Sequence, residues 1–127
     1  FDSEKFAGDL ERVRKGLGVE FSLPIYDRTL HEPVEGGVTI APDQSLVMVE
    51  GLYLLSKEGA FGRIPPLLDL SIFVDCSEEE SSERVVGRKV ANGTPQADAL
   101  AHYEKVDRIN AHAVNLTRGD ADCTLSL

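Results

Sequence analysis

The sequence predicts one α/β domain built around a mainly parallel β-sheet. An uninterrupted apolar run over 46–49 and a mainly apolar run over 70–74, which contains one serine, are typical of strands buried on both faces of such a sheet. Segments with helical periodicity alternate with these runs, which is the order expected when helices connect parallel strands. The first run ends at Glu50 and Gly51, so we expect a carboxylate at the edge where α/β sheets bind ligands.

The N-terminal third predicts a helix and a hairpin-like excursion. Residues 3–15 carry apolar side chains at helical spacing, with Asp2 or Ser3 available as the cap. Residues 21–26 contain a proline, which favours a loop or an edge strand. The polar residues that follow predict a turn or loop over 27–37, and then a short strand over 38–40.

The central part predicts a buried strand over 46–50, a helix start or tight turn over 52–56, and a short helical turn at 65–69. The second apolar run predicts another buried strand, which ends at Asp75.

The C-terminal half predicts two helices and a last strand. The helix over 77–90 begins with a capping box formed by Ser77 and Glu80, and acidic residues in its first turn complement the helix dipole. A second, long helix is expected over 96–114, with Tyr103 on its apolar face. A short strand over 122–127 completes the order.

Composition and charge narrow the class of protein. The net charge of −9 argues against nucleic acids and anionic membranes as partners, because both repel an acidic surface. No apolar run approaches the roughly 18 residues that a membrane span needs, and the first residues do not resemble a signal peptide. Cys76 and Cys123 lack metal-ligand spacing, so we expect free thiols in a reducing cytoplasm.

Glu50 is the first candidate for chemistry. A carboxylate at a strand end can hold a water of a nucleotide-bound Mg²⁺, since Mg²⁺ keeps several waters and takes few carboxylates. The alternative is a helix cap or an ordinary surface contact. No G-x-x-x-x-G-K-[ST] phosphate loop occurs in the 127 residues.

Several segments, in order, resemble the uridine kinase family. Residues 23–27, Leu-Pro-Ile-Tyr-Asp, and the later His31 resemble a Pro-x-Tyr-Asp segment of that family, which a histidine follows. Residues 47–53, Val-Met-Val-Glu-Gly-Leu-Tyr, resemble the Walker B strand of that family. Residues 70–75 resemble its next core strand, and the tail over 107–122 is similar to a subgroup that includes sugar kinases and relatives of pantothenate kinase. The resemblance covers nearly the whole chain and implies a P-loop NTPase-like three-layer sandwich that lacks its first strands.

The resemblance also implies roles for individual residues. Arg84 and Arg88 fall where the family carries lid arginines, and their spacing places both on one helical face. Such a pair can clamp a transferring phosphoryl group, although surface pairing with nearby glutamates is the alternative. The possible lid is expected over 84–97. Arg118 resembles the family's loop beside the adenine, and a plain turn is the alternative.

Tyr26 and His31 are the candidates for contact with the acceptor substrate. The phenol would donate or accept a hydrogen bond and the imidazole would stack, whereas ordinary packing and solvent exposure are the alternatives. Asp27 is more simply explained as a turn-capping aspartate.

These observations lead to an ATP- and Mg²⁺-dependent kinase that acts on a hydroxyl of a small metabolite, such as a nucleoside or a sugar. We expect residues 1–127 to be the C-terminal portion of one nucleoside-kinase-like domain, whose phosphate loop and catalytic base lie outside this numbering. The rival hypothesis is a non-catalytic nucleotide-fold module. The oligomeric state is open, with a homodimer as one option.

Overall fold

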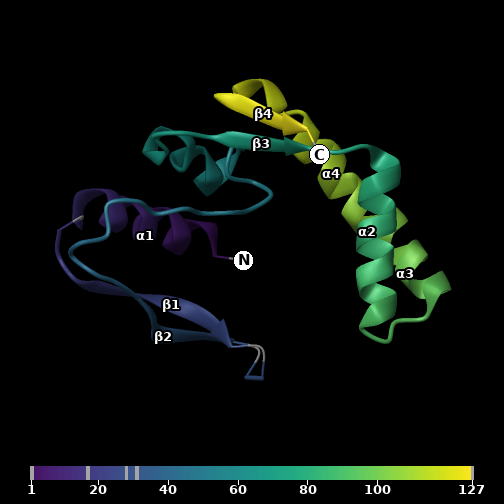
Figure 1. Cartoon of the computed structure of the whole chain (residues 1–127), viewed down its shortest axis with the longest axis horizontal. Coiled ribbons are helices and arrows are strands. Elements are labelled where there is room, and N and C mark those ends of the chain that lie inside the picture. The colour runs from purple at the N-terminus through teal and green to yellow at the C-terminus, as the bar shows by residue number, and fades with distance from the viewer. Residues whose placement is uncertain (1, 17, 28, 31, 127) are drawn as a thin grey trace.

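The computed structural model describes residues 2–16, 18–27, 29–30 and 32–126. Figure 1 shows an open arrangement, in which helix α1 and the β1–β2 hairpin lie to one side, strands β3 and β4 lie above, and helices α2, α3 and α4 descend on the other side. Within the described residues, no helix is both long and apolar enough to span a membrane.

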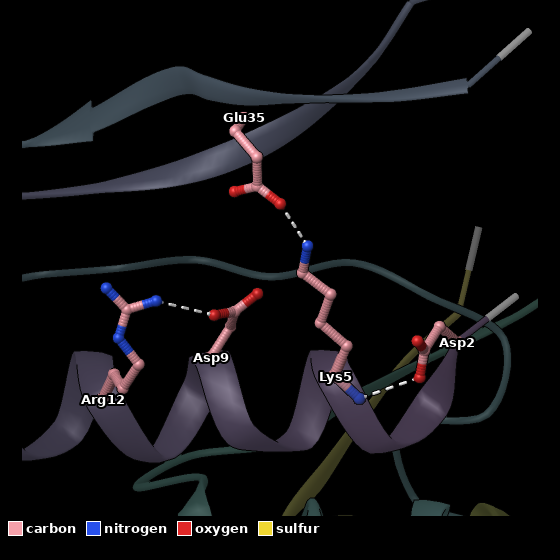
Figure 2. A network of polar contacts seen from close by, with 5 residues as sticks. All are labelled: Asp2, Lys5, Asp9, Arg12 and Glu35. Atoms are coloured by element: carbon pink, nitrogen blue, oxygen red, sulfur yellow. Dashed lines mark hydrogen bonds and ion pairs between the residues drawn. The ribbon is translucent and has the colours of Figure 1, made fainter.

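Helix α1 (Ser3–Gly16) forms where its apolar periodicity predicts it. The Asp2 carboxylate caps the first turn by accepting a hydrogen bond of 2.9 Å from the backbone N–H of Lys5. On the same face, Lys5 forms an ion pair with Glu35 of the hairpin, and Arg12 bonds Asp9 at 3.0 Å (Figure 2). The Lys5–Glu35 ion pair connects α1 to the hairpin, whereas Ala7 and Val13 are buried on the apolar face of the helix.

Two arginines connect α1 to the segment between residues 59 and 69. Arg63, at the end of the 3₁₀ helix η1 (Gly59–Arg63), bonds Glu4 at 2.6 Å and Glu11 at 2.7 Å. The Arg63 hydrogen bond holds the pKa of Glu11 below its ordinary value. Arg14 bonds the carbonyl oxygen of Leu67 and the carboxylate of Asp69, beside η2 (Pro65–Leu67).

Strands β1 (Phe21–Asp27) and β2 (Glu32–Ile40) form an antiparallel hairpin. The edge strand expected over 21–26 is confirmed, but the loop expected over 27–37 is wrong for most of its length. Pro33 and the glycines are compatible with a strand here because a two-stranded sheet has only edges. Gly37 is required by packing, since a Cβ at this position would lie 2.0 Å from Ile25 Cγ2.

The buried strand expected over 46–50 is wrong for this structure. No strand is assigned there, and Figure 1 draws the stretch as an unpaired tube. Leu46 is 79% exposed and Met48 is 86% exposed. A strand is defined by its backbone pairing, and the described residues offer this segment no neighbouring strand.

Strands β3 (Ile72–Asp75) and β4 (Cys123–Ser126) form a parallel pair in which Ile72 lies opposite Cys123 and Asp75 lies opposite Ser126. The expected positions of both strands are confirmed, but only Phe73 of β3 is buried. Before the pair begins, the Asp122 carboxylate accepts hydrogen bonds from the Ser71 backbone N–H and hydroxyl, at 2.7 and 2.6 Å. These bonds hold the pKa of Asp122 below its ordinary value.

Helix α2 (Glu78–Ala91) begins with the predicted capping box. The Ser77 hydroxyl accepts from the Glu80 backbone N–H at 3.2 Å, and the Glu80 carboxylate accepts from the Ser77 backbone N–H at 3.1 Å. The bond from the Ser77 backbone N–H lowers the pKa of Glu80, and so does a bond of 3.2 Å that the Ser77 hydroxyl donates to the same carboxylate; the charge of Arg84 has a smaller effect.

The long helix expected over 96–114 is confirmed, but it contains one π-helical turn. Helix α3 (Gln96–His102) continues through the π turn η3 (Tyr103–Asp107) into α4 (Arg108–Asn115). The wider turn shifts the apolar face by one position, so Tyr103 is buried while Val106 is 42% exposed. The π turn also brings the His102 Nδ1 atom within 3.0 Å of Asp107 Oδ2 and 3.1 Å of the Lys89 Nζ atom on α2.

The accessible surface shows how little of the chain is enclosed. The area is 9147 Å², whereas a self-contained domain of this mass would expose about 6,600 Å². Apolar side chains contribute to this surface: Leu70, shortly before β3, and Ile72 and Val74 of β3 are each more than half exposed. The α/β class is confirmed, with one parallel and one antiparallel pair of strands in the described residues.

Candidate functional site

The carboxyl end of β3 holds an ion pair that involves the candidate residue Arg118. Asp75 is the last residue of β3, and its carboxylate lies 2.9 Å from the Arg118 Nη2 atom. Arg118 begins the 3₁₀ turn η4 (Arg118–Asp120), which precedes β4 in sequence. Its guanidinium therefore reaches across to the edge where ligands bind in α/β sheets.

The same turn has a second attachment. Asp120 forms an ion pair of 2.6 Å with Lys57, which follows the unpaired 46–50 stretch. The turn expected at 118–120 is therefore observed, and it is joined by ion pairs to two segments that are distant in sequence. The predicted contact of Arg118 with a nucleotide base stays a prediction.

Arg84 and Arg88 lie on α2, one helical turn apart, and both are exposed. No ion pair or side-chain hydrogen bond joins either guanidinium to another described residue, so the alternative of pairing with Glu80 or Glu83 is not realised as a contact. The next residue, Lys89, instead contacts Asp107 at 3.7 Å. The Lys89–Asp107 contact shows that the side of α2 that carries Lys89 faces η3. Arg84 and Arg88 lie on a different side of the helix, because consecutive positions on a helix are rotated by about 100°.

Glu50 is exposed at the end of the unpaired stretch. Within the described part of the chain its carboxylate has no hydrogen-bond or ion-pair partner, so the alternative of a helix cap is not observed. An exposed carboxylate without a protein partner can accept a hydrogen bond from a metal-bound water. The described residues contain no group of three or more His, Cys, Asp and Glu side chains that could hold a metal ion.

Tyr26 lies near the end of β1, where it is 58% exposed and pairs with Pro33 across the hairpin. His31 lies outside the described residues. The Asp27 carboxylate accepts from the backbone N–H groups of Thr29 and Leu30, at 2.7 and 2.9 Å. These bonds lower the pKa of Asp27 and confirm its turn-capping role.

The structure does not bring all of these residues into one cluster. Figure 1 shows the hairpin and α2 at opposite sides of the view, so β1, which carries Tyr26, lies apart from α2, which carries Arg84 and Arg88.

Two hollows occur elsewhere, and neither contains a predicted residue. A cleft of about 550 Å³ lies between β3, α2 and α4, with a largely apolar wall that includes Leu52, Phe73 and Ile109. A smaller hollow of about 320 Å³ is lined mainly by glutamates of α2 and η3. The negative charge of these glutamates would repel a triphosphate, so we assign no phosphate chemistry to this smaller hollow.

Sequence reasoning missed Asp75 and Lys57 as members of the site. A carboxylate that ends an apolar strand is a usable signal for Asp75, and it is the same signal that pointed to Glu50. Lys57 lies in a polar loop, and nothing in its sequence context predicts a contact 63 positions away.

No protein-family model matches the chain. The chain is 30% identical over 127 residues to the uncharacterized protein YggC of Escherichia coli, a match that covers all of the chain and 52% of YggC. It is also 30% identical over 116 residues to the ATP-dependent kinase-like protein notR' of Aspergillus versicolor, covering 87% of the chain and 67% of that protein. A third relative, uridine kinase-like protein 5 of Arabidopsis thaliana, is 26% identical over 106 residues, which are 83% of the chain and 21% of that protein.

The chain belongs to the uridine-kinase-like family of P-loop kinases. Two solved structures show the same fold. A candidate fructose transport system kinase from Silicibacter sp. TM1040 matches with a TM-score of 0.87 and 25% identity, over 98% of this chain and 60% of that one. The Saccharomyces cerevisiae protein YFH7, a candidate P-loop kinase with a circular permutation, matches with a TM-score of 0.81 and 20% identity, over 100% and 47%.

This family member therefore spans about half the length of YggC and less than two thirds of either solved kinase chain. The α/β fold class inferred from the strand and helix order is confirmed as that of the P-loop kinases. The unpaired 46–50 stretch and the exposed strand faces are consistent with a part of that fold. The expected lid boundaries at 84–97 and the site residues stay predictions.

Proposed function

We propose that this chain contributes to an ATP-dependent kinase that phosphorylates a hydroxyl of a small metabolite, such as a nucleoside or a sugar. The observation that supports the proposal is the pair Arg84 and Arg88, which are exposed on one face of α2 and form no ion pair with any other described residue. In a P-loop kinase fold, two uncommitted guanidiniums on a helix can close over a transferring phosphoryl group.

Glu50 fits the metal requirement of this reaction. Mg²⁺ bound with ATP would neutralise charge between the phosphates, and it would be held chiefly by phosphate oxygens and waters. An exposed carboxylate without a protein partner can accept a hydrogen bond from such a water. The absence of a protein-only metal cluster in the described residues is compatible with this mode of binding.

The acceptor would be held by the hairpin. Tyr26 is exposed near the end of β1, so its phenol can bond a ligand hydroxyl, and His31 would stack beside it. Arg118 would face the nucleotide base at the carboxyl end of β3. The lysine of the phosphate loop and the catalytic base would be supplied by residues outside the 127.

The test is an ATP-consumption screen of the intact protein against nucleosides, sugars and vitamins, followed by variants with the best acceptor. Arg88→Ala should lower kcat by roughly a hundredfold or more, as expected for loss of a group that stabilises charge in the transition state. Binding of ATP should be nearly unchanged. Lys105→Ala, which removes an exposed cation of η3, is the control and should leave turnover unaltered.

Two results would count against the proposal in different ways. Equal turnover in Arg88→Ala and the wild type would remove the lid role of α2. An intact protein that binds ATP but consumes none with any acceptor would favour the rival hypothesis, a non-catalytic nucleotide-fold module.

A further inference from the structure

Arg118 differs from the other candidate cations because it is held in place. Its Nη2 atom bonds the Asp75 carboxylate at 2.9 Å, whereas Arg84 and Arg88 have no such partner among the described residues. The turn that carries Arg118 precedes β4, and β4 begins opposite the start of β3 rather than its end. Bonding to Asp75 is therefore what draws the guanidinium to the carboxyl end of β3.

The backbone of the turn is restrained from another side. Asp120 bonds Lys57 at 2.6 Å, and the backbone N–H groups of Asp120 and Ala121 donate to the carbonyl oxygens of Thr117 and Arg118. These contacts fix the turn, but they leave the long side chain of Arg118 free to rotate. Among the described residues, the contact with Asp75 is the one that selects a direction for this side chain.

The guanidinium keeps most of its binding capacity in this arrangement. It has five N–H donors, one nitrogen of which contacts Asp75, and half of the side chain is exposed, at 51%. The exposed part of this guanidinium can stack on a heteroaromatic base, an interaction that a lysine ammonium cannot reproduce.

We propose that Asp75 is a positioning residue, which orients the Arg118 guanidinium so that its open face meets the base of the bound nucleotide. This inference rests on the proposed function and adds a residue to it. Asp75 itself touches neither substrate nor phosphate. Because the bond to Asp75 fixes one rotamer of Arg118 before the nucleotide binds, less side-chain entropy is lost on binding. Loss of Asp75 should therefore change nucleotide affinity rather than the rate of the chemical step.

The ion pair is partly exposed, with 51% of the Arg118 side chain and 26% of the Asp75 side chain accessible. Asp75→Asn keeps the shape of the buried part of the side chain, so it should change stability little and allows a clean test. In the intact protein, Asp75→Asn should raise the KM for ATP and the Kd of a fluorescent ATP analogue by about three- to tenfold. The kcat and the melting temperature should stay close to the wild-type values. Asp69→Asn is the control, because it also removes a carboxylate that bonds an arginine at 2.9 Å, in this case Arg14 of α1.

A double-mutant cycle with Arg118→Ala separates positioning from general electrostatics. Once Arg118 is absent, Asp75→Asn should have no further effect on nucleotide affinity, and Arg118→Lys should not restore the wild-type value. An unchanged KM in Asp75→Asn, or an equal effect with and without Arg118, would overturn the inference while leaving the kinase proposal intact. A wild-type protein that binds no nucleotide would overturn both.

Discussion

Truncation of Tyr103 should destabilise the packing between α2 and the α3–η3 helix more than any other single change in the C-terminal half. Tyr103 is 2% exposed and is the largest fully buried side chain. Removing a buried aromatic ring costs about 3–5 kcal/mol. The 550 Å³ cleft borders this ring and can admit water into the vacated space, so we expect Tyr103→Ala to cost about 3 kcal/mol, at the lower end of that range.

The phenol oxygen contributes much less than the ring. It donates to the Glu78 carbonyl oxygen at 3.3 Å, which is long for an O–H···O bond. Tyr103→Phe should therefore cost less than about 1 kcal/mol. The free energy of unfolding is measured by urea titration of the intact protein with far-UV circular dichroism, in which an unchanged slope shows that the unfolded state is not altered.

A tyrosine of similar chemistry but different burial provides the control. Tyr26 is 58% exposed on the hairpin, and Tyr26→Ala should change the unfolding free energy by less than about 0.5 kcal/mol. The reasoning is refuted if Tyr103→Ala is within about 1 kcal/mol of the wild type, or if Tyr103→Phe is as costly as Tyr103→Ala.

Three further predictions follow from local contacts. Ser77→Ala removes the α2 cap and should lower the unfolding free energy by about 1 kcal/mol, measured by the same titration. Gly37→Ala should destabilise the hairpin and increase its amide hydrogen exchange, because the added Cβ meets Ile25 Cγ2 at 2.0 Å. The lowered pKa of Asp122, caused first by the Ser71 hydroxyl bond, means that its stabilising effect is present above its ordinary value of 3.8 and is lost as the pH falls below it. Asp122→Asn should therefore flatten the acid limb of the stability curve.

Each of these predictions has a matched comparison. Ser82→Ala changes a serine inside α2 that caps nothing, and its effect should be near zero or slightly stabilising. Gly8→Ala places a Cβ where no atom lies within 4 Å, so it should not destabilise α1. If the Asp122→Asn protein keeps the acid limb of the wild type, the Ser71–Asp122 bonds are not the source of that pH dependence.

The helices and the α/β class could be predicted because their signals are local. The apolar spacing of α1 and the capping box of α2 depend on residues three or four positions apart, and a helix satisfies its own backbone within that distance. The turn cap at Asp27 is local in the same sense. The π turn at 103–107 was not predictable, since the packing of Tyr103 and the contact of Lys89 with Asp107 favour it from outside the segment.

The strands show the opposite case. The stretch 46–50 has the composition of a buried strand, but pairing is supplied by a neighbour, and the described residues contain none for it. Residues 27–37 look like a loop, yet β1 offers them a pairing partner and most of them become strand.

The candidate site likewise combines features that the local sequence determines with features that depend on contacts between distant segments. Sequence alone determined which residue types are present: a carboxylate after an apolar strand at Glu50, and two arginines one turn apart at 84 and 88. Only the tertiary structure showed that Asp75 bonds Arg118 and that Lys57 bonds Asp120, because these ion pairs join segments at least 43 positions apart. Contacts at such separations depend on how the segments pack, and no local sequence pattern encodes them.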